Sequence, residues 1–505
     1  MTKHWKKITA LACLAAVSVG ALAGCSGGSA AKIDKSNPKI TIMTESYQMD
    51  PATTASPIYQ ALEEYLGTKL DIQFTANSGY NEKVTAAMGS GSYPHAMLIK
   101  ERNSSVIQNS RAGTFWEIGN EIKDSAKYPN LSQANPVILN NTSIDGKVYG
   151  LYRARELGRA GMTIRKDWLD KLNMKIPTTV DELYEVLKAF KEKDPDGNGA
   201  EDTFGMIVTK SPSTFDPLAV WFGAPNKWGK DANGELQPDF MTDEYLEAMK
   251  FMKKLYDEKL INQDFATYDA TKWDEQFLSG KAGVIIDVAD RARRIATNIA
   301  PVDPKAEIEV LGYVKKDAAS EPKTLPTTGY AGYFVFPKKA VADEEDLQFV
   351  LSVFDKMNNP DAQTMMNWGI EGRQYTVNDD GTITLTDNEA LKKEYADLNQ
   401  VSTGIVEGLR KQKYATPVAE RVDEVYAENR KYVVANPAEA LISDTYSRKG
   451  VNLDAIITEA RTKFIAGQID ENAWKNEIER WKSQGGTEYI KEINDQYKLA
   501  QSNAK

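Results

Sequence analysis

The sequence predicts an α/β protein with two lobes, and three observations support this fold class. A strand at 39–43, a helix at 58–66 and a strand at 70–74 form a βαβ unit, which favours a parallel sheet. The chain has 505 residues, which is more than the roughly 100–200 residues of one compact domain. Beyond Asp346 the hydrophobic pattern is almost entirely helical, so we expect a helical C-terminal part.

The N-terminal segment has the three parts of a secretory signal. Lysines at positions 3, 6 and 7 precede an apolar run at 8–22, and small residues precede Cys25. The run is shorter than the ~20 residues of a membrane-spanning helix. Leu22-Ala23-Gly24-Cys25 resembles the bacterial lipobox, which implies a signal peptide over 1–24 and a diacylglycerol on the Cys25 thiol. The small polar residues that follow predict a flexible lipidated tether over 25–37. The alternative is an ordinary signal peptide with a chance cysteine.

Charge, cysteine and histidine content exclude several classes of function. The formal net charge is −10, and without the three signal lysines 59 basic residues face 72 acidic ones, a net charge of −13. This charge argues against a nucleic-acid partner. Of the two cysteines, one lies in the signal and the other is Cys25, which excludes a disulfide or a cysteine zinc site in the body of the protein. His95 is the only histidine after residue 24, so among enzymes those with paired carboxylates remain open.

Further elements follow in order along the chain. Strands are predicted at 96–99, 203–208, 282–286, 308–313 and 330–336, and helices at 80–88, 166–172, 245–258, 271–278, 347–357, 418–434, 453–465 and 473–482. The clearest helix follows Thr179, which forms a capping box with Glu182. Trp168, Trp474 and Trp481 lie on amphipathic helices, and we expect them to pack in the core.

An Asp- and Asn-rich loop at 194–202 predicts a structural calcium site. An EF-hand loop supplies oxygen ligands from positions 1, 3, 5, 7 and 9 and needs glycine at position 6. The corresponding ligands are Asp194, Asp196, Asn198, the Ala200 carbonyl and Asp202, with Gly199 at position 6. Position 12 is Gly205 instead of glutamate, because a strand follows where an EF-hand has its second helix, and the sixth ligand is unassigned. The alternative is a polar turn without metal.

Seven residues are predicted to contact a substrate. Sugar rings have apolar faces that lie flat on aromatic rings, while their hydroxyls need polar partners nearby. The predicted substrate-binding residues are Tyr152, Arg153, Trp221, Trp228, Trp273, Trp368 and Arg373. Polar residues flank Trp273 and Trp368 in particular. For each aromatic residue taken alone, core packing is the better-supported alternative.

Arginines stand out in this acidic chain at positions 153, 155, 159 and 165, and again at 291, 293 and 294. Guanidinium groups bind carboxylates through two hydrogen bonds, so uronic-acid substrates would suit them. The alternative, a set of surface salt bridges, is favoured over this interpretation.

Several segments, in this order, resemble one protein family. They are the lipobox, Arg165–Leu172 followed by Ile176–Thr179, Asp194–Asp202, Phe222–Asn226 and Gly369–Tyr375. Their order and spacing cover nearly the whole mature chain. They resemble the family 1 extracellular solute-binding lipoproteins of Gram-positive bacteria, whose large members serve carbohydrate importers and are similar to alginate-binding proteins.

The resemblance implies a periplasmic-binding-protein-like fold with a hinge and a ligand cleft. The first α/β lobe would comprise 38–162 and 328–400, with Trp368. The second would comprise 163–327 and 401–505, with Trp273, the calcium loop and the C-terminal helices. The protein would be a monomer without enzymatic activity, lipid-anchored on the extracellular face of the cell membrane. It would capture an oligosaccharide and deliver it to the permease subunits of an ABC importer.

Two alternative functions stay open at this point. One is a surface-tethered carbohydrate-active enzyme that uses paired carboxylates. The other is a receptor for a peptide or a lipid precursor, because one fold serves many ligands. An enzyme would consume its sugar, whereas a binding protein would only shift its own melting temperature.

Overall fold

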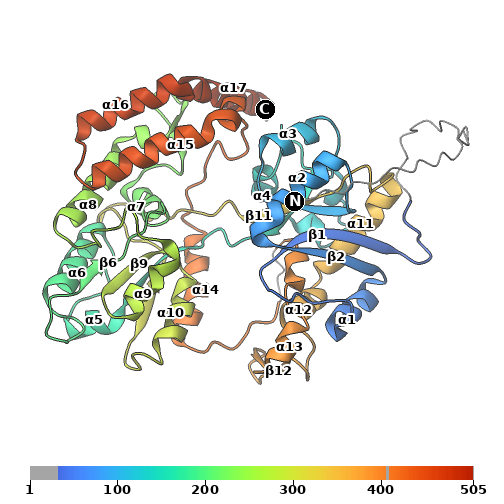
Figure 1. The fold of residues 1–505 in the computed structure, drawn as a ribbon, viewed down its shortest axis with the longest axis horizontal. Coiled ribbons are helices and arrows are strands. Elements are labelled where there is room, and N and C mark those ends of the chain that lie inside the picture. The colour runs from blue at the N-terminus through green and yellow to red at the C-terminus, as the bar shows by residue number, and fades with distance from the viewer. Residues whose placement is uncertain (1–31, 405–408, 504–505) are drawn as a thin grey trace, which may run out of the picture.

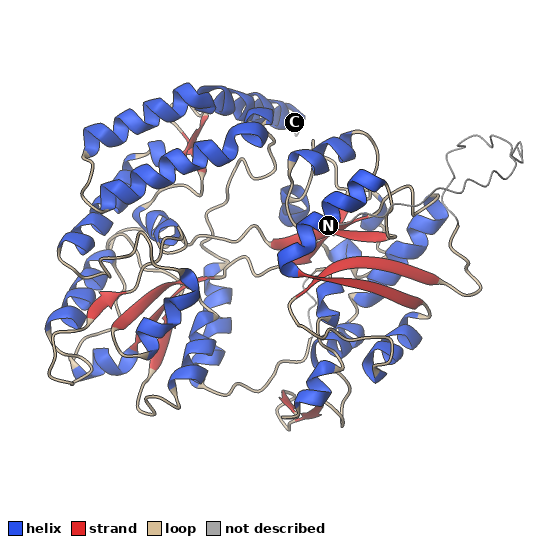
Figure 2. Ribbon diagram, in the orientation of Figure 1, coloured by secondary structure: helices blue, strands red, loops and turns tan. Residues whose placement is uncertain are grey.

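The structure is a computed structural model that describes residues 32–404 and 409–503, and it consists of two lobes lying side by side (Figure 1). Figure 2 shows that each lobe has its own sheet with helices around it. The predicted α/β fold with two lobes is therefore confirmed. The predicted signal peptide, Cys25 and most of the predicted tether lie outside the described residues. Among the residues that are described, no helix has the length and apolar composition needed to cross a membrane.

The first lobe contains a five-stranded sheet in the order β2-β1-β3-β11-β4. The strands are β1 (Lys39–Ser46), β2 (Lys69–Ala76), β3 (Ala96–Ile99), β4 (Gly150–Ala154) and β11 (Tyr330–Val335). β1 is parallel to β2 and β3, and β11 is antiparallel to β3 and β4. β1 to β4 therefore run in one direction and end at the same edge of the sheet. The predicted βαβ unit is confirmed as β1, α1 (Pro57–Leu66) and β2.

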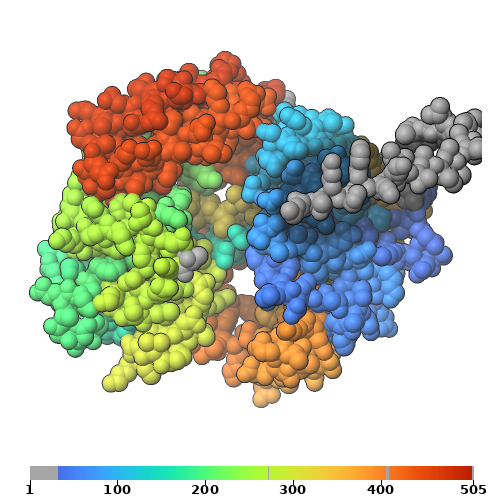
Figure 3. All heavy atoms as spheres, in the orientation of Figure 1, coloured from blue at the N-terminus to red at the C-terminus, as the bar shows by residue number. Residues whose placement is uncertain are grey.

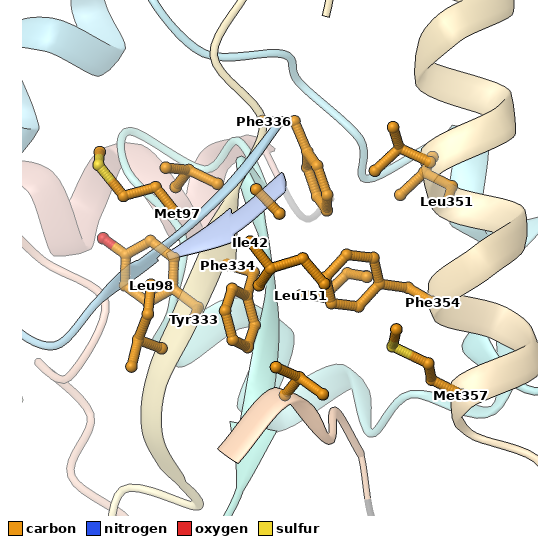
Figure 4. Packing of buried hydrophobic residues seen from close by; sticks show 14 of the residues in the cluster. Ile42, Met97, Leu98, Leu151, Tyr333, Phe334, Phe336, Leu351, Phe354 and Met357 are labelled. Atoms are coloured by element: carbon orange, nitrogen blue, oxygen red, sulfur yellow. The ribbon is translucent and has the colours of Figure 1, made fainter. Parts of the chain in front are cut away.

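The core of the first lobe joins this sheet to helices from distant parts of the chain. They are α1, α2 (Tyr80–Ser90), α3 (Ser104–Arg111), α4 (Pro136–Asn141), α11 (Glu344–Met357) and α12 (Pro360–Trp368). Figure 4 shows side chains of α11 facing those of the sheet. The ring centroid of Phe354 lies 5.4 Å from that of Phe334 and 5.7 Å from that of Phe336. Because aromatic rings bury large apolar areas, these contacts bind α11 firmly to β11 and its continuation.

The second lobe contains a four-stranded sheet in the order β10-β5-β9-β6. The strands are β5 (Ala160–Arg165), β6 (Phe204–Met206), β9 (Ala282–Val288) and β10 (Ile308–Leu311). β6 is parallel to β9, and β5 is antiparallel to both β9 and β10. The carboxyl ends of β6, β9 and β10 therefore share one edge with the amino end of β5. A separate hairpin pairs β7 (Trp228–Lys230) with β8 (Leu236–Pro238).

Among the residues that the structure describes, ten helices of the second lobe surround this sheet or extend its core. They are α5 (Lys166–Lys171), α6 (Val180–Glu192), α7 (Phe215–Phe222), α8 (Asp243–Asp257), α9 (Trp273–Leu278), α10 (Arg291–Ile299), α14 (Pro417–Asn429), α15 (Asp444–Ile465), α16 (Glu471–Trp481) and α17 (Thr487–Asn503). Trp168, Trp474 and Trp481 are buried there, which confirms their predicted packing role.

The predicted cap of α6 is also present. Thr179 Oγ1 accepts a hydrogen bond from Glu182 N (3.3 Å). The Glu182 carboxylate reaches back to Thr178 N (2.7 Å), one residue before the cap. The first contact satisfies a backbone N–H group that the first turn of a helix leaves free, and the second joins the residue before the cap to the helix.

Two parts of the chain differ from the prediction. β5 was not predicted, because Gly161, the arginine just before the strand and the arginine at its last position interrupt its apolar alternation. The helical run expected after Asp346 is broken at 369–404 and 409–416. The first of these segments contains the hairpin β12 (Tyr375–Val377) and β13 (Ile383–Leu385) and the short helix α13 (Glu389–Lys393). The turn residues Asp380 and Gly381 carry the sequence signal for that hairpin.

In the described part of the chain, three connections join the elements of the two sheets, apart from a bridging segment after α14. The chain passes from β4 to β5 at 155–159, from β10 to β11 at 312–329, and from a short helix at Leu398–Val401 to α14 at 402–416, where 405–408 lie outside the described residues. The predicted lobe limit between residues 162 and 163 falls inside β5, whose two neighbouring strands both belong to the second sheet.

A bridging segment, residues 430–443, returns from α14 to the first lobe before α15 begins. Ile442 packs in the core of the first lobe, whereas α15 packs in the core of the second. Near the start of α15, Arg111 of α3 pairs with Asp444 (3.5 Å) and Ser104 Oγ donates to Ser447 O (3.4 Å). Figure 1 shows α15 and α3 close together above the connections.

Candidate ligand-binding cleft

The two sheets face each other end to end, and the space between the facing ends is the candidate site. β4 leads through only 155–159 into β5, so the carboxyl end of β4 faces the edge of the second sheet at which β5 begins. Figure 3 shows the surface hollowed between the two halves. In open α/β sheets, ligands bind outside the carboxyl ends of the strands. Both walls of this cleft are strand ends of that kind.

Glu45, near the end of β1, organises the wall formed by the first lobe. Its buried carboxylate pairs with Lys100 Nζ (2.8 Å) and Arg153 Nη1 (2.7 Å). It also accepts hydrogen bonds from Tyr47 Oη (3.1 Å) and Asn77 Nδ2 (2.8 Å). Burial by itself would raise the pKa of Glu45, but Lys100 and Arg153 lower that pKa overall. The carboxylate is therefore ionised at neutral pH and holds two cations at the edge of the cleft.

Tyr47 is an exposed aromatic residue on this wall that sequence reasoning missed. Its exposed fraction is 59%. Asp397 fixes the backbone here, since its Oδ2 accepts hydrogen bonds from Tyr47 N (3.1 Å) and Gln48 N (2.9 Å). Burial on one side and the nearby Glu45 charge raise the pKa of Tyr47, so the phenol stays neutral. The available sequence signal is its position directly after a strand that ends at the cleft.

On the opposite wall, Asp290 and Arg291 follow β9. Arg159 makes two hydrogen bonds to the Asp290 carboxylate (2.9 and 2.8 Å), and Tyr426 Oη donates to the same carboxylate (2.8 Å). Burial would raise the pKa of Asp290, but Arg159 and Tyr426 lower that pKa overall. Because Tyr426 lies on α14, this carboxylate also joins the helix to the wall.

Arg155 lies in the first connection, between the two walls. Its side chain is exposed, and among the described residues it has no hydrogen-bond or ion-pair partner. Surrounding protein lowers the pKa of Arg155, and the positive charge of Arg159 lowers it further. The Arg155 side chain is thus accessible to water and yet surrounded by protein, as expected for a residue that lines a cleft.

Two of the predicted substrate residues lie on or near the wall of the first lobe. Arg153 donates to Glu45 and to the Gln400 side chain. Trp368 is partly exposed at the end of α12, and its Nε1 donates to Arg410 O (3.0 Å). A chain of side-chain hydrogen bonds from Gln400 through Asn399 reaches Asn367, the residue before Trp368.

The other three predicted tryptophans are buried. The exposed fractions of Trp221, Trp228 and Trp273 are 2%, 6% and 2%. Trp273 Nε1 donates to Ile207 O (3.2 Å), and the Arg291 guanidinium covers its ring at 4.4 Å. None of the three rings presents a face to solvent in this structure. Trp273 instead supports Arg291, which lies at the second lobe's wall.

The two remaining predicted residues lie away from the cleft walls. Tyr152 alternates with Arg153 along β4, so the two side chains point to opposite faces of the sheet. The Tyr152 side chain lines a cavity of about 480 Å³ beside the first and third connections between the lobes. Its Oη accepts a hydrogen bond from Asn135 N (2.9 Å). Arg373 is exposed and pairs with Glu394 (2.9 Å).

The predicted calcium loop brings all five of its ligand residues into one hydrogen-bonded group, to which Ala200 contributes its backbone N–H. The Asp194 carboxylate accepts hydrogen bonds from the backbone N–H groups of Gly197, Asn198 and Gly199, each at 3.1 Å. Asn198 Nδ2 donates to Asp196 (2.7 Å) and to Asp202 (3.2 Å). Lys281 pairs with Asp202 (2.7 Å). Carboxylate and amide oxygens are the ligands that calcium prefers.

A metal centre is not formed by this group as it stands. Within 32–404 and 409–503, no three or more His, Cys, Asp and Glu side chains are arranged to hold a metal ion. The Lys281 ammonium group occupies one side of Asp202. The oxygen groups nevertheless suit calcium by their chemistry.

Comparisons with known proteins agree with this geometry. A model of the family described as bacterial extracellular solute-binding protein matches residues 46–364. The chain is 42% identical over 510 residues to lipoprotein LipO of Bacillus subtilis, covering 98% of each chain. It is 36% identical over 490 residues to the polygalacturonan/rhamnogalacturonan-binding protein YtcQ of the same species, covering 95% of this chain and 96% of YtcQ.

Solved structures share the fold. The Streptococcus pneumoniae ABC-transporter substrate-binding protein FusA in complex with kestose matches with a TM-score of 0.68 at 19% identity, covering 92% of this chain and 100% of FusA. An EF-hand mutant of FusA in complex with fructo-nystose matches with a TM-score of 0.66 at 18% identity and the same coverage.

Proposed function

Because this chain belongs to the family of bacterial extracellular solute-binding proteins, we propose that it captures an oligosaccharide in the cleft between its lobes and delivers it to an ABC importer. The family consists of binding proteins, which sets aside the alternative of a carbohydrate-active enzyme. YtcQ is named for binding polysaccharides, and FusA was solved with kestose. These names favour a sugar over a peptide or a lipid precursor as the ligand.

The observation that carries this proposal is the pair of polar walls that face each other across the cleft. The first lobe offers the exposed Tyr47 ring for stacking on a sugar face and Arg153 for its hydroxyls. The second lobe offers Arg159 and Asp290. Trp368 is a second aromatic candidate beside the first wall. A sugar held from both sides favours the closed form, because contacts to both walls exist only when the lobes approach each other.

We propose further that a lipid on Cys25 anchors the protein on the extracellular face of the cell membrane. Leu22-Ala23-Gly24-Cys25 and the small polar residues after it support this anchor. LipO, which is named a lipoprotein, aligns over 98% of both chains. The permease subunits of the importer are the proposed partners. A monomer is the proposed working unit, because one chain supplies both walls of the cleft.

We propose that the loop at 194–202 binds calcium and that the ion stabilises the second lobe. Asp194, Asp196, Asn198 and Asp202 would supply side-chain oxygens, and Ala200 its carbonyl. Their grouping in one hydrogen-bonded loop supports this assignment, and so does the existence of an EF-hand in FusA. The ion would offset the mutual repulsion of three carboxylates.

The proposed function is tested by titrating the mature protein with a broad panel of plant and microbial oligosaccharides. We expect at least one sugar to raise the melting temperature and to be recovered unchanged after incubation, because a binding protein shifts only its own equilibrium. Stabilisation by peptides and by no sugar of the panel would contradict the proposal. Turnover of a bound sugar by the purified protein would instead support the alternative of a carbohydrate-active enzyme.

A further inference from the structure

One group of charges in the cleft has a surplus of positive charge. This cleft cluster consists of Glu45, Lys100, Arg153, Arg155, Arg159 and Asp290. Glu45 pairs with Lys100 and Arg153, and Asp290 pairs with Arg159. Arg155 is left without a partner for its side chain in the described part of the chain. Four cations and two carboxylates leave a charge of +2 here, although the whole chain has a formal charge of −10.

Hydrogen bonds hold the backbone around Arg155 from several sides. Arg155 N donates to Gly329 O (2.9 Å), which joins the first connection to the second. Asn429 Nδ2 of α14 donates to Gly158 O (2.8 Å) and to Ala160 O (2.7 Å). A Cβ placed on Gly158 would lie 2.7 Å from Asn429 Cβ, so the connection and the helix are in close contact. The Arg155 side chain therefore starts from a well-held position, which lowers the entropic cost of binding through it.

Closure of the cleft changes the energetics of an unpaired guanidinium. While the cleft is open, water solvates Arg155. When the lobes approach, part of that water leaves, and a charge without a partner then costs free energy. A ligand carboxylate would remove this cost, because it accepts two parallel hydrogen bonds from one guanidinium. A neutral ligand would leave the charge uncompensated.

We propose that the ligand is an acidic oligosaccharide and that Arg155 binds the carboxylate of one of its uronic-acid residues. This inference rests on the proposed function and adds the chemical class of the ligand. The relatives differ on this point. YtcQ is named for polygalacturonan, which is a polymer of galacturonic acid, whereas kestose in FusA has no carboxylate. The unpaired Arg155 favours the acidic class for this chain.

The test uses calorimetric titration of the mature protein with three probes, which are an oligogalacturonide, the same oligomer with every carboxyl methyl-esterified, and kestose. We expect the oligogalacturonide to bind and the ester and kestose to bind at least about 10-fold more weakly, since a charged bidentate contact is lost. Arg155→Ala should weaken binding of the oligogalacturonide by about 10- to 100-fold and bring it close to the ester. Arg155→Lys should retain part of the affinity, because it keeps the charge and loses the fork geometry.

Arg480→Ala is the matched control, since Arg480 is exposed on α16, far along the chain from the cleft cluster, and pairs with Glu477. It should leave all three affinities unchanged. Equal weakening of the acid and the ester by Arg155→Ala would overturn the carboxylate contact and leave Arg155 as a hinge residue. Should Arg155→Ala fail to fold, the acid–ester comparison on the native protein still decides the point.

The inference and the proposed function fail in different ways. Binding of kestose but not of oligogalacturonide by the native protein would overturn the inference and leave oligosaccharide capture standing. Binding of none of the three probes would also overturn the inference. The proposed function is overturned only when the broader sugar panel fails as well.

Discussion

Glu45 is the side chain on which the first wall of the cleft depends most. It is buried and paired with two cations, so we expect Glu45→Gln to lower the free energy of unfolding at pH 7 by about 3 kcal/mol, as removal of one partner from a buried ion pair does. Because the folded protein lowers the pKa of this carboxyl, its stabilisation is complete above the unfolded pKa of about 4.3 and is lost as the pH falls through the folded pKa. Denaturant unfolding between pH 7 and 3 measures this difference.

The variant and the native protein should therefore converge in stability at the acid end of that range. Glu235→Gln is the control, because Glu235 forms an exposed pair with Lys498 and should contribute almost nothing at any pH. A constant difference between Glu45→Gln and the native protein over the whole range would show that packing, and not charge, is responsible.

Cys25 carries the second prediction about a single residue. Cys25→Ser should prevent lipidation and either release the protein into the medium or leave its signal uncut. Cell fractionation and the mass of the protein measure both outcomes. Cys13→Ser is the matched control, since Cys13 lies within the apolar run and should leave anchoring unchanged. A membrane-bound, normally processed Cys25→Ser protein would rule out the lipid anchor.

At individual positions the sequence predicts residue chemistry better than it predicts exposure. Arg153 lies on a cleft wall, but Trp221, Trp228 and Trp273 are buried. Tyrosine and tryptophan serve cores and sugar sites equally well, so composition cannot separate the two roles. Tyr47 could be identified as a cleft residue only from the sheet topology, which shows that the end of β1 faces the cleft.

The loop at 194–202 is the segment for which metal chemistry can be measured directly. If calcium binds it, the native protein should melt at a higher temperature in calcium than in a chelator. At about 100 times the dissociation constant the gain is about 2.7 kcal/mol. Asp196→Ala removes one proposed ligand and should abolish most of that difference while leaving stability in chelator unchanged. Calorimetric melting under both conditions provides the measurement.

Asp317→Ala provides the control for the loop. Asp317 also caps an exposed turn in the second lobe, through hydrogen bonds from Ala319 N and Ser320 N, but it lies outside the loop at 194–202. It should melt with the same calcium dependence as the native protein. If calcium and chelator give the same melting temperature for the native protein, the loop is a polar turn.

Among the helices and strands, those with strong local signals could be predicted and those defined by distant partners could not. The cap at Thr179 and the apolar face of α6 are local features, and the helix is where they place it. β5 has a glycine at its second position, and its strand conformation depends on β9 and β10 on either side. Tertiary pairing of this kind overrides local propensity.

The protein as a unit should close when it binds its ligand. Each lobe has its own core, and the backbone can turn in the described parts of the connections, at 155–159, 312–329, 402–404 and 409–416. Small-angle scattering should show a smaller radius of gyration with a bound oligosaccharide than without one, because closure brings the two walls together. The same sugar should leave the radius unchanged in a variant that does not bind it.

The expected closing motion has a structural limit in the bridging segment. Ile442 is fixed in the first core while α15 belongs to the second, so the start of α15 must move with one lobe and slide against the other. The contacts between Arg111 and Asp444 (3.5 Å) and between Ser104 and Ser447 (3.4 Å) are exposed and long. They can therefore break and re-form during such a movement. An unchanged radius with every sugar that binds would instead indicate that the lobes are rigidly joined.

The place of β11 in the first sheet has a consequence for the order in which the chain acquires structure. β11 lies between β3 and β4, yet all the strands of the second sheet precede it in the chain. A chain that emerges N-terminus first therefore exposes β3 and β4 with unpaired edges until residue 335 has appeared. The second sheet, drawn entirely from 160–311, can assemble during that interval, because its pairings are closer in sequence. The earliest strands of the protein thus complete their sheet last. The risk of aggregation is greatest while the edges of β3 and β4 are still unpaired.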